Sequence, residues 1–370
     1  MREILPELEG WQREREDVVL ATIVETRGSG PRSPGAHLGI TRAGKMAGSV
    51  SSGCVDNDVY RRALEVLDRG APMVASFSVS DAPELGVGLS CGGSIEVLIE
   101  RFADADAWRA AREAIASATP VVLVVALEPQ SILGRRMAIV GTESAAEQDS
   151  EAVRVTGSID VTLDAAIVEE ACALLEQGGT RLSRLAQGQG EAAVFLEAVL
   201  PARRLIVVGA TDTARALARL AKVLGFEVVV VDARAAYARR DRVPDADELL
   251  CAWPADVLDE RWLDRRTSLV TLAHDPKLDV PALACALKSG VPYVGALGSR
   301  RTHEGRKQAL REMGFTDEDI ARVHSPVGLD LGGRTAEEIA LAILAEIVAV
   351  KHGRDTARLV VRDEKGNGAG

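Results

Sequence analysis

The chain has 370 residues, of which 47% are hydrophobic and 27% are charged, and its formal net charge at pH 7 is −11. Because one hydrophobic core seldom grows past about 250 to 300 residues, this length predicts two or three domains. The apolar content excludes a largely disordered chain. The negative charge argues against nucleic acid as a partner, since phosphates are recognised mainly by Lys and Arg.

No integral membrane segment and no secretory signal are expected. The longest apolar runs, 121–127 and 339–345, are far shorter than the roughly 20 residues of a spanning helix. The first residues mix charged and apolar side chains and lack the basic start and apolar stretch of a signal peptide. Five cysteines without a Cys-x-x-Cys pair argue against a disulfide framework and a zinc ribbon. We therefore expect a cytoplasmic protein.

The first part of the chain predicts a small α+β unit with glycine-rich loops. Glycine and proline exclude a helix over 28–35, and a Gly/Ser loop carries Cys54 directly before a stretch with helical spacing of apolar residues. A second glycine-rich turn carries Cys91. Strands are expected at 18–26, 37–41 and 95–99.

An internal duplication is predicted for the N-terminal domain, residues 1–200, with one copy at 18–99 and the other at 121–200. A gapless alignment from Gly48 and Gly157 onward places Leu163 opposite Cys54, and the second copy has no Cys-Gly-Gly turn. We therefore expect only the first copy to have kept its chemistry. The alternative is two unrelated α+β segments with chance matches.

From residue 201 to 352 strands and helices alternate, which predicts a Rossmann-like domain with a doubly wound parallel sheet. Strands are expected at 205–208, 227–231, 249–251, 268–272 and 293–296, and helices at 281–288, 302–313 and 336–351. The last helix starts with a capping box of Thr335 and Glu338. The tail 353–370 is expected to be flexible. The predicted fold class is therefore α/β, with an N-terminal α+β domain before the Rossmann-like domain.

The first turn of the Rossmann-like domain matches a dinucleotide-binding turn only in part. Gly209 follows the first strand, but Thr211 stands where a second glycine would let a pyrophosphate approach the backbone. Asp232 ends the second strand and is placed to accept ribose hydroxyls, while Arg234 could contact a phosphate. Two interpretations stay open, bound NAD(P) and a Rossmann scaffold with another use.

Two further segments end strands at the same rim of the predicted sheet. His274, Asp275 and Asp279 allow either a metal or proton-transfer site, or a helix-capping Asp beside a surface His. The next segment opens a helix and offers backbone N–H groups and a guanidinium to an anion. The residues of this expected anion site are Gly298, Ser299 and Arg300.

Cys54 is the strongest single candidate for chemistry. A Gly/Ser loop exposes it, and a helix N-terminus lowers the pKa of a thiol toward the reactive thiolate. The alternative is a small buried hydrophobe, because free Cys is among the most buried residue types. Cys91 is similar but has no helix behind it. The remaining cysteines are expected to pack on apolar faces, and they are Cys172, Cys251 and Cys285.

Several motifs occur together and in a fixed order. The N-terminal part contains GSGPRSPGAHL, GSVSSGCVD and GLSCGG, and the C-terminal part contains VDAR, TLAHDPKLD, GALGSRR and SPVGLDLGGRTAEEIALAILAEIVA. From about Val18 to Ala349 this combination resembles the XdhC/CoxF-type accessory proteins of molybdenum hydroxylases. The chain departs from the family pattern at Ser51-Ser52 and Asp56, where relatives commonly have a glycine run and a Glu.

The resemblance implies a maturation factor that binds the molybdenum cofactor, molybdopterin with its metal. Such a protein protects the cofactor while a cysteine desulfurase installs the terminal sulfur, and delivers it to an apo molybdenum hydroxylase of the xanthine dehydrogenase type. By position, Cys54 and Cys91 match the N-terminal cysteines of the family. Its C-terminal motif is matched by Asp275, Gly298, Ser299 and Arg300.

We therefore predict a molybdenum-cofactor chaperone, with a NAD(P)-dependent oxidoreductase as the alternative. No catalytic residue is assigned, and Cys54 either ligates the metal or carries sulfur. A homo-oligomer is a further alternative to a monomer. The residues expected to bind the cofactor are Arg32, Gly53, Cys54, Cys91, Gly209, Asp232, Asp275, Gly298, Ser299 and Arg300.

Overall fold

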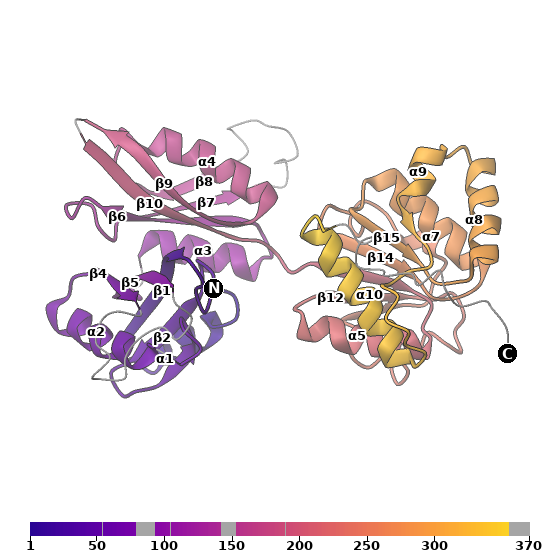
Figure 1. Ribbon diagram of the computed structural model, residues 1–370, viewed down its shortest axis with the longest axis horizontal. Helices are drawn as coiled ribbons and strands as arrows, with labels where there is room; N and C mark the ends of the chain where they lie inside the picture. The colour runs from indigo at the N-terminus through magenta and orange to yellow at the C-terminus, as the bar shows by residue number, and fades with distance from the viewer. Residues whose placement is uncertain (54, 79–92, 104, 142–152, 189, 355–370) are drawn as a thin grey trace, which may run out of the picture. The chain divides into compact units, whose positions relative to one another are not determined.

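The computed structural model of the protein describes residues 1–53, 55–78, 93–103, 105–141, 153–188 and 190–354. The chain divides into two compact units, Met1–Pro201 and a second that starts at Ala202 (Figure 1). Within the described ranges, no helix has both the length and the apolar character needed to span a membrane. Most of the predicted tail lies outside the described residues.

The first half of the N-terminal unit is built on a five-stranded antiparallel sheet with the order β3-β2-β1-β5-β4. Strand β1 is buried along most of its length, which explains its continuous apolar run in place of an alternating one. The elements are α1 (Leu5–Arg13), β1 (Val18–Arg27), β2 (His37–Thr41), β3 (Met46–Gly48), α2 (Asp56–Arg69), β4 (Met73–Ser78) and β5 (Ser94–Arg101).

The second half repeats this element order. Its sheet has the order β8-β7-β6-β10-β9, which is the order of the first sheet strand for strand. The elements are α3 (Asp106–Ala116), β6 (Val121–Glu128), β7 (Arg136–Gly141), β8 (Val153–Gly157), α4 (Asp164–Gln177), β9 (Gly179–Gln187) and β10 (Gly190–Val199).

One glycine at the end of the third strand of each half shows how closely the halves agree. Gly48 has φ +79°, and a Cβ there would lie 2.4 Å from the carbonyl oxygen of His37. Gly157 has φ +88°, and a Cβ would lie 2.4 Å from the carbonyl oxygen of Arg136. Both positions require glycine for the same two reasons, a left-handed backbone and close contact with the neighbouring strand.

The gapless alignment of the two halves is wrong by one residue after this glycine. Helix α2 begins eight residues after Gly48, whereas α4 begins seven residues after Gly157. The N-cap residues of the two helices are Val55 and Leu163, and both are buried. Leu163 therefore corresponds to Val55 and not to Cys54, and the loop of the first half has one extra residue.

The two sheets of the N-terminal unit pack against each other. One core cluster joins side chains of β1 and β5 with side chains of β6 and β10. A second cluster includes α1 and α3, and Figure 1 shows α3 between the sheets. The outer faces are covered by α2 on the first sheet and by α4 on the second. The central strands of each sheet are thus buried on both faces, as their apolar sequences require.

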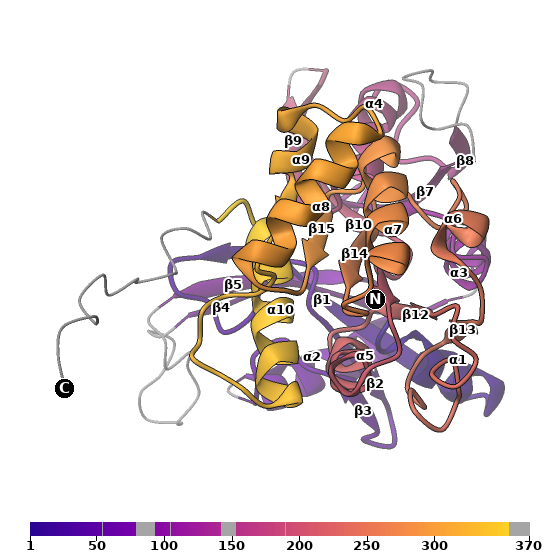
Figure 2. The ribbon, with the colours of Figure 1, turned by 90° about the vertical axis from the view of Figure 1, so that its right-hand side faces the viewer.

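The C-terminal unit is a six-stranded parallel sheet with the order β13-β12-β11-β14-β15-β16. Helices α5 and α10 cover one face, and α6 to α9 cover the other, where α7 and α8 lie side by side (Figure 2). The elements are β11 (Arg204–Val208), α5 (Asp212–Val223), β12 (Glu227–Val231), β13 (Glu248–Leu250), α6 (Pro254–Val257), β14 (Thr267–Thr271), α7 (Pro276–Ser289), β15 (Tyr293–Ala296), α8 (Arg300–Glu312), α9 (Asp317–Ala321), β16 (Val323–His324) and α10 (Ala336–Lys351).

The predicted fold class is confirmed, an α+β unit followed by a doubly wound parallel sheet. The capping box of Thr335 and Glu338 is formed at the start of α10. The predicted start of α7 is wrong, because the helix begins at Pro276 and carries Pro281 in its interior. A proline is typical of a first helical turn, so both Pro276 and Pro281 could mark the start of the helix. The helix starts at the first of them, because Asp275 caps it there by accepting a hydrogen bond from the amide of Lys277.

Candidate functional site

The predicted residues of the C-terminal unit lie at the carboxyl ends of the parallel strands, where doubly wound sheets bind ligands. Gly209 follows β11 with φ +104°, and a Cβ there would lie 2.6 Å from the backbone nitrogen of Ala273, after the neighbouring β14. Thr211 caps α5 by accepting a hydrogen bond from the amide of Ala214. The glycine therefore allows close packing of the two strand ends.

Asp232 is fully buried and already has several partners. Its carboxylate accepts hydrogen bonds from the Ala210 amide at 2.9 Å and from the guanidinium of Arg234 at 2.9 and 2.8 Å. Burial raises the pKa of Asp232, but the hydrogen bonds from Arg234 and Ala210 outweigh burial and hold that pKa below its ordinary value. A ribose hydroxyl would have to compete with these donors.

The histidine and the two carboxylates after β14 have separate surroundings. Asp275 accepts from the Lys277 amide at 2.9 Å as the N-cap of α7, and His274 precedes it with φ +55°. Asp279 points into the interior and accepts a 2.5 Å hydrogen bond from Arg306. Across the residues that the structure describes, no group of three or more His, Cys, Asp and Glu side chains could hold a metal ion. The capping interpretation of Asp275 agrees with this geometry.

Gly298 and Ser299 end the loop after β15, and Ser299 caps α8 by accepting from the Thr302 amide at 3.2 Å. Arg300 is the first residue of that helix. Below the loop lies Arg306, which is 3% exposed and donates to the carbonyl of Leu297 at 2.8 Å. A Cβ at Gly298 would lie 3.0 Å from its Nη1. Sequence reasoning missed this buried arginine, because the polar helix around it predicts an exposed side chain.

In the N-terminal unit, a pocket of about 650 Å³ lies beside the loop that precedes Cys54. Its wall includes Arg32, and Ser52 lines it with φ +56°. Gly53 comes next, with φ +106° and open space around the position of a Cβ. Cys54 and Cys91 themselves lie outside the described residues. Residues 31–37, Gly48 and Glu197 are also among the lining residues.

The floor of this pocket is a buried histidine–carboxylate pair that sequence reasoning missed. His37 Nε2 lies 2.8 Å from Glu197 Oε1, and His37 Nδ1 lies 3.0 Å from the hydroxyl of Thr22. Burial lowers the pKa of His37, so the ring is neutral, donates to Glu197 and accepts from Thr22. Burial raises the pKa of Glu197, but His37 and the N-terminal ammonium of Met1 outweigh burial and lower that pKa to about 2.

The loop before Cys54 is held by the first residue of α2. The carboxylate of Asp56 accepts from the hydroxyls of Ser49 and Ser51, each at 2.7 Å, and from the Ser51 amide at 3.1 Å. The Ser51 hydroxyl in turn accepts from the amide of Val55 at 2.8 Å. This set of hydrogen bonds fixes the loop conformation through side chains where the backbone has no regular structure.

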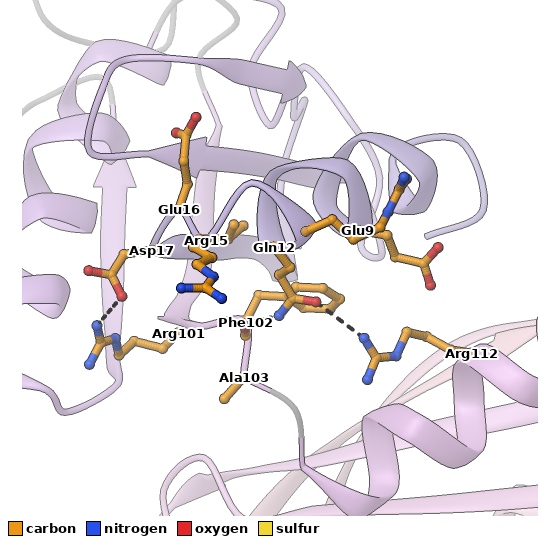
Figure 3. A pocket seen from close by; sticks show the side chains of 11 residues that line it. Glu9, Gln12, Arg15, Glu16, Asp17, Arg101, Phe102, Ala103 and Arg112 are labelled. Carbon is orange, nitrogen blue, oxygen red and sulfur yellow. Dashed lines mark hydrogen bonds and ion pairs between the residues drawn. The ribbon is translucent and has the colours of Figure 1, made fainter.

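A second pocket of the N-terminal unit, of about 730 Å³, holds none of the predicted residues (Figure 3). Among its charged groups, Arg101 pairs with Asp17 at 2.6 Å. Gln12 donates to the carbonyl of Phe102 at 2.8 Å and accepts from Arg112 at 3.2 Å. Because no residue that the sequence predicts for the site lines it, this pocket is the weaker candidate.

The other cysteines divide into two kinds. Cys172 and Cys285 are partly buried, and burial raises the pKa of each thiol, which makes both poor nucleophiles. Cys251 is exposed, so its predicted packing on an apolar face is wrong. It directly follows β13, which is an edge strand of the sheet.

Comparisons with known proteins agree with this two-part organisation. A family model described as the XdhC Rossmann domain matches residues 205–347, and a model of the XdhC and CoxI family matches residues 11–78. A similar curated relative from Bacillus subtilis (strain 168) is named as a probable xanthine dehydrogenase subunit. It is 27% identical over 352 residues, which cover 93% of this chain and 96% of the relative.

Another relative is the molybdenum cofactor insertion chaperone PaoD of Escherichia coli (strain K12), 26% identical over 333 residues that cover 90% of this chain and 83% of PaoD. A crystal structure of a xanthine dehydrogenase from Bacillus halodurans matches with a TM-score of 0.73 at 24% identity, covering 95% of this chain and 96% of that chain. At that identity the likeness concerns the fold. With one model on each of its two units, in the order in which the motifs occur, the chain belongs to the XdhC and CoxI family.

Proposed function

We propose that the protein is a molybdenum-cofactor chaperone that holds the cofactor and transfers it to an apo molybdenum hydroxylase of the xanthine dehydrogenase type. The name of the relative PaoD supports the insertion step, and the name of the Bacillus subtilis relative supports the kind of client. A cysteine desulfurase is the proposed source of the terminal sulfur, which is added while the cofactor is held.

The observation that carries this proposal is the pocket beside the loop that precedes Cys54. Arg32 lies on its wall and is exposed, and within the described part of the chain its guanidinium makes no ion pair. An arginine without a carboxylate partner at the edge of a polar pocket is available to an anionic ligand. Ser52 also lines the pocket, and Gly53 and Cys54 follow it in the chain.

The residues present fit an anionic pterin phosphate with a soft metal. The pocket volume of about 650 Å³ lies within the usual range of small-molecule sites. Arg32 would bind the phosphate, and Gly53 leaves open space at its Cβ position for a ligand. Cys54 would hold the molybdenum as a thiolate or carry its sulfur, and Cys91 is proposed beside it. When bound, the cofactor supplies a soft metal and its dithiolene, for which thiolates are suitable ligands.

In the C-terminal unit we propose that the ends of the parallel strands accept a further anionic group. The caps formed by Ser299 and Asp275 order the backbone there, and Gly298 leaves Arg306 as the nearest side chain beneath the loop. The proposed contacts are Gly209, Asp232, Asp275, Gly298, Ser299 and Arg300. NAD(P) is a weak candidate for this rim, because Arg234 already occupies the Asp232 carboxylate and Thr211 replaces the second glycine.

The test is to load the full-length protein anaerobically with molybdenum cofactor and to measure bound molybdopterin and molybdenum per chain after gel filtration. Replacing the Arg32 guanidinium, in Arg32→Ala, is expected to lower the affinity at least about tenfold, because a charge-assisted bond to phosphate is lost. Cys54→Ala is expected to retain less molybdenum than molybdopterin. The matched control is Arg219→Ala, an exposed arginine of α5 that also makes no ion pair within the described residues.

Full retention of both molybdopterin and molybdenum by Arg32→Ala and by Cys54→Ala would contradict the proposed site. Failure of the wild-type protein to bind molybdopterin at all would contradict the proposed function. Activation of an apo hydroxylase by the loaded protein is a second readout, which separates transfer of the cofactor from its binding.

A further inference from the structure

The C-terminal unit has a pocket of about 520 Å³ that none of the predicted site residues lines. It opens beside the carboxyl end of the edge strand β16, between the loop 325–333 and helix α10. Gly328 lets this loop lie against the helix, since a Cβ there would come within 3.1 Å of the backbone of Ala342. The family motif SPVGLDLGG therefore forms one wall of a cavity.

Glu346 of α10 lies at the back of this pocket as a buried carboxylate with three donors. It accepts from the hydroxyl of Tyr293 at 2.6 Å, from the amide of Gly328 at 2.8 Å and from Nδ1 of His324 at 3.1 Å. Burial raises the pKa of Glu346, but the hydrogen bonds from His324, Tyr293 and Gly328 outweigh burial and lower that pKa. The group is therefore an ionised carboxylate that can only accept hydrogen bonds.

This carboxylate decides the tautomer of His324. Because Glu346 only accepts, Nδ1 of His324 must carry the proton of their hydrogen bond. In the neutral ring Nε2 is then a hydrogen-bond acceptor, and no hydrogen bond among the described residues engages it. The ring is stacked on Tyr293 with 4.8 Å between centroids and lines the pocket with 27% of its side chain exposed. A buried carboxylate thus presents an oriented acceptor to the cavity.

Asp330 adds a carboxylate from the loop. Its only hydrogen bond within the described residues is a long one, 3.4 Å, from the amide of Gly332. The other carboxylate of the rim, Glu338, is used by the capping box of α10. Between the polar groups the walls are apolar, and their side chains are Leu297, Val327, Leu329, Leu331, Ile339 and Ala342. A ligand here meets apolar walls and hydrogen-bond acceptors.

We infer that this pocket binds a planar heterocycle with a 2-amino-4-oxopyrimidine edge, the edge that pterins and guanine share. The ring N–H and the amino group of this edge form a pair of donors, which matches the two oxygens of Asp330. Nε2 of His324 accepts a further N–H, and the apolar walls cover the ring faces. The inference concerns another pocket, whose lining residues differ from those of the proposed cofactor site.

The experiment is isothermal titration of the full-length protein with pterin and with guanosine, each beside an analogue that lacks the 2-amino group. These analogues are lumazine for pterin and inosine for guanosine. At least one of the two ligands is expected to bind, and its analogue about tenfold more weakly or worse, because the lost amino group leaves a carboxylate oxygen without its donor. Binding of pterin alone identifies a pterin, and binding of guanosine alone identifies a nucleobase, and both results support the inference.

Two variants locate the binding. Asp330→Asn is expected to weaken binding about tenfold, because one carboxylate oxygen becomes a donor facing a donor. His324→Gln is expected to weaken it less and retains a polar group at the same position. Asp330 is exposed, so its replacement should leave the fold intact, which far-UV circular dichroism checks. The control is Asp256→Asn, an exposed aspartate of α6 away from the pocket lining.

The inference is overturned if neither pterin nor guanosine binds at about 1 mM, the weak end of specific binding. It is also overturned if lumazine and inosine bind as tightly as their partners, or if Asp330→Asn binds like the wild type. The two sites are tested by different variants, the proposed cofactor site by Arg32→Ala and this pocket by Asp330→Asn. Failure here is therefore distinguishable from failure of the proposed function.

Discussion

The two halves of the N-terminal unit share one strand order and differ in what their loops carry. At equivalent places each half contributes a base from its second strand and an acid from its last strand, and each base pairs with the acid of the other half. His37 pairs with Glu197, and Arg136 pairs with Glu100. The register shows the equivalence, because Glu100 lies opposite Leu20 in β1 and Glu197 lies opposite Leu123 in β6.

The difference lies at the mouths of two equivalent pockets. The pocket above His37 and Glu197 has about 650 Å³ and includes the polar loop with Arg32. Its counterpart beside Glu100 has about 310 Å³, and the corresponding loop points Ile132 into the core. The longer loop before α2 belongs to the same half as the larger pocket. The comparison indicates one shared scaffold with a ligand site kept in one copy, in agreement with an internal duplication.

Of the predicted effects on the two ion pairs, the largest is expected from replacing Arg136. Its guanidinium is buried against Glu100 and lies 4.6 Å above the ring of Trp108. Arg136→Met leaves the Glu100 carboxylate buried without its partner, so we expect the free energy of unfolding of this unit to fall by about 3 to 5 kcal/mol. Urea unfolding followed by hydrogen exchange in β1 and β6 measures the effect in the N-terminal unit.

The control is the double variant Arg136→Met/Glu100→Met, which removes both charges. It is expected to recover much of the loss, since two apolar side chains of similar volume can replace a buried ion pair. A double variant as unstable as Arg136→Met would show that packing around Trp108 matters more than the uncompensated charge.

Much of the fold could be predicted from periodicity and capping. Strand β2 at His37–Thr41, strand β12 at Glu227–Val231 and helix α10 at Ala336–Lys351 have the predicted bounds. Helix α1 was not predicted, because its pattern mixes charged and apolar residues and its two buried leucines, Leu5 and Leu8, pack only in the tertiary structure. Such an element is formed by contacts that a local pattern does not contain.

Less of the site could be predicted, because its members come from distant strands. Loop composition predicts Arg32 and Gly53 as site residues, but the His37–Glu197 pair joins residues 160 positions apart. In the sequence, His37 and Glu197 each look like an ordinary residue of a strand. Only the packing of one sheet on the other brings them together. Pairings of this kind depend on topology and not on spacing.

The second prediction concerns how the stability of the His37–Glu197 pair depends on pH. The pKa of Glu197 is about 2 in the folded protein and 4.5 in an ordinary carboxyl, so the unfolded chain takes up the proton first. Its contribution to stability, on the order of 3 kcal/mol, is present above pH 4.5 and is lost as the pH falls toward 2. The neutral His37 acts in the same direction below pH 6.5, since burial lowers its pKa as well.

Glu197→Gln is therefore expected to be less stable than the wild type at pH 7 and nearly equal to it near pH 2.5. Urea unfolding measured from pH 2.5 to 7 gives both curves. The control is Glu191→Gln, an exposed residue of the same strand, which should run parallel to the wild type. A Glu197→Gln curve that keeps the full wild-type slope between pH 4.5 and 2.5 would exclude this carboxylate as the cause.

The smallest expected loss of stability comes from two equivalent aspartates, and it separates the role of the shared fold from the role of the loop before Cys54. Asp56 and Asp164 each open the helix of their half and hold the loop before it, Asp56 through Ser49 and Ser51, and Asp164 through the Ser158 hydroxyl at 2.6 Å and the Ile159 amide at 3.0 Å. Replacing either by Ala removes equivalent hydrogen bonds at a helix N-terminus, so each variant should lose about 1 to 2 kcal/mol of stability.

The effects of these two variants on molybdopterin binding should differ, because only the loop held by Asp56 leads into Cys54. We expect Asp56→Ala to bind molybdopterin several-fold more weakly and Asp164→Ala to bind it like the wild type, measured on the same anaerobically loaded proteins. Equal binding by the two variants would mean that the loop of the first half has no special part in holding the cofactor, and the two halves would then differ in sequence without differing in function.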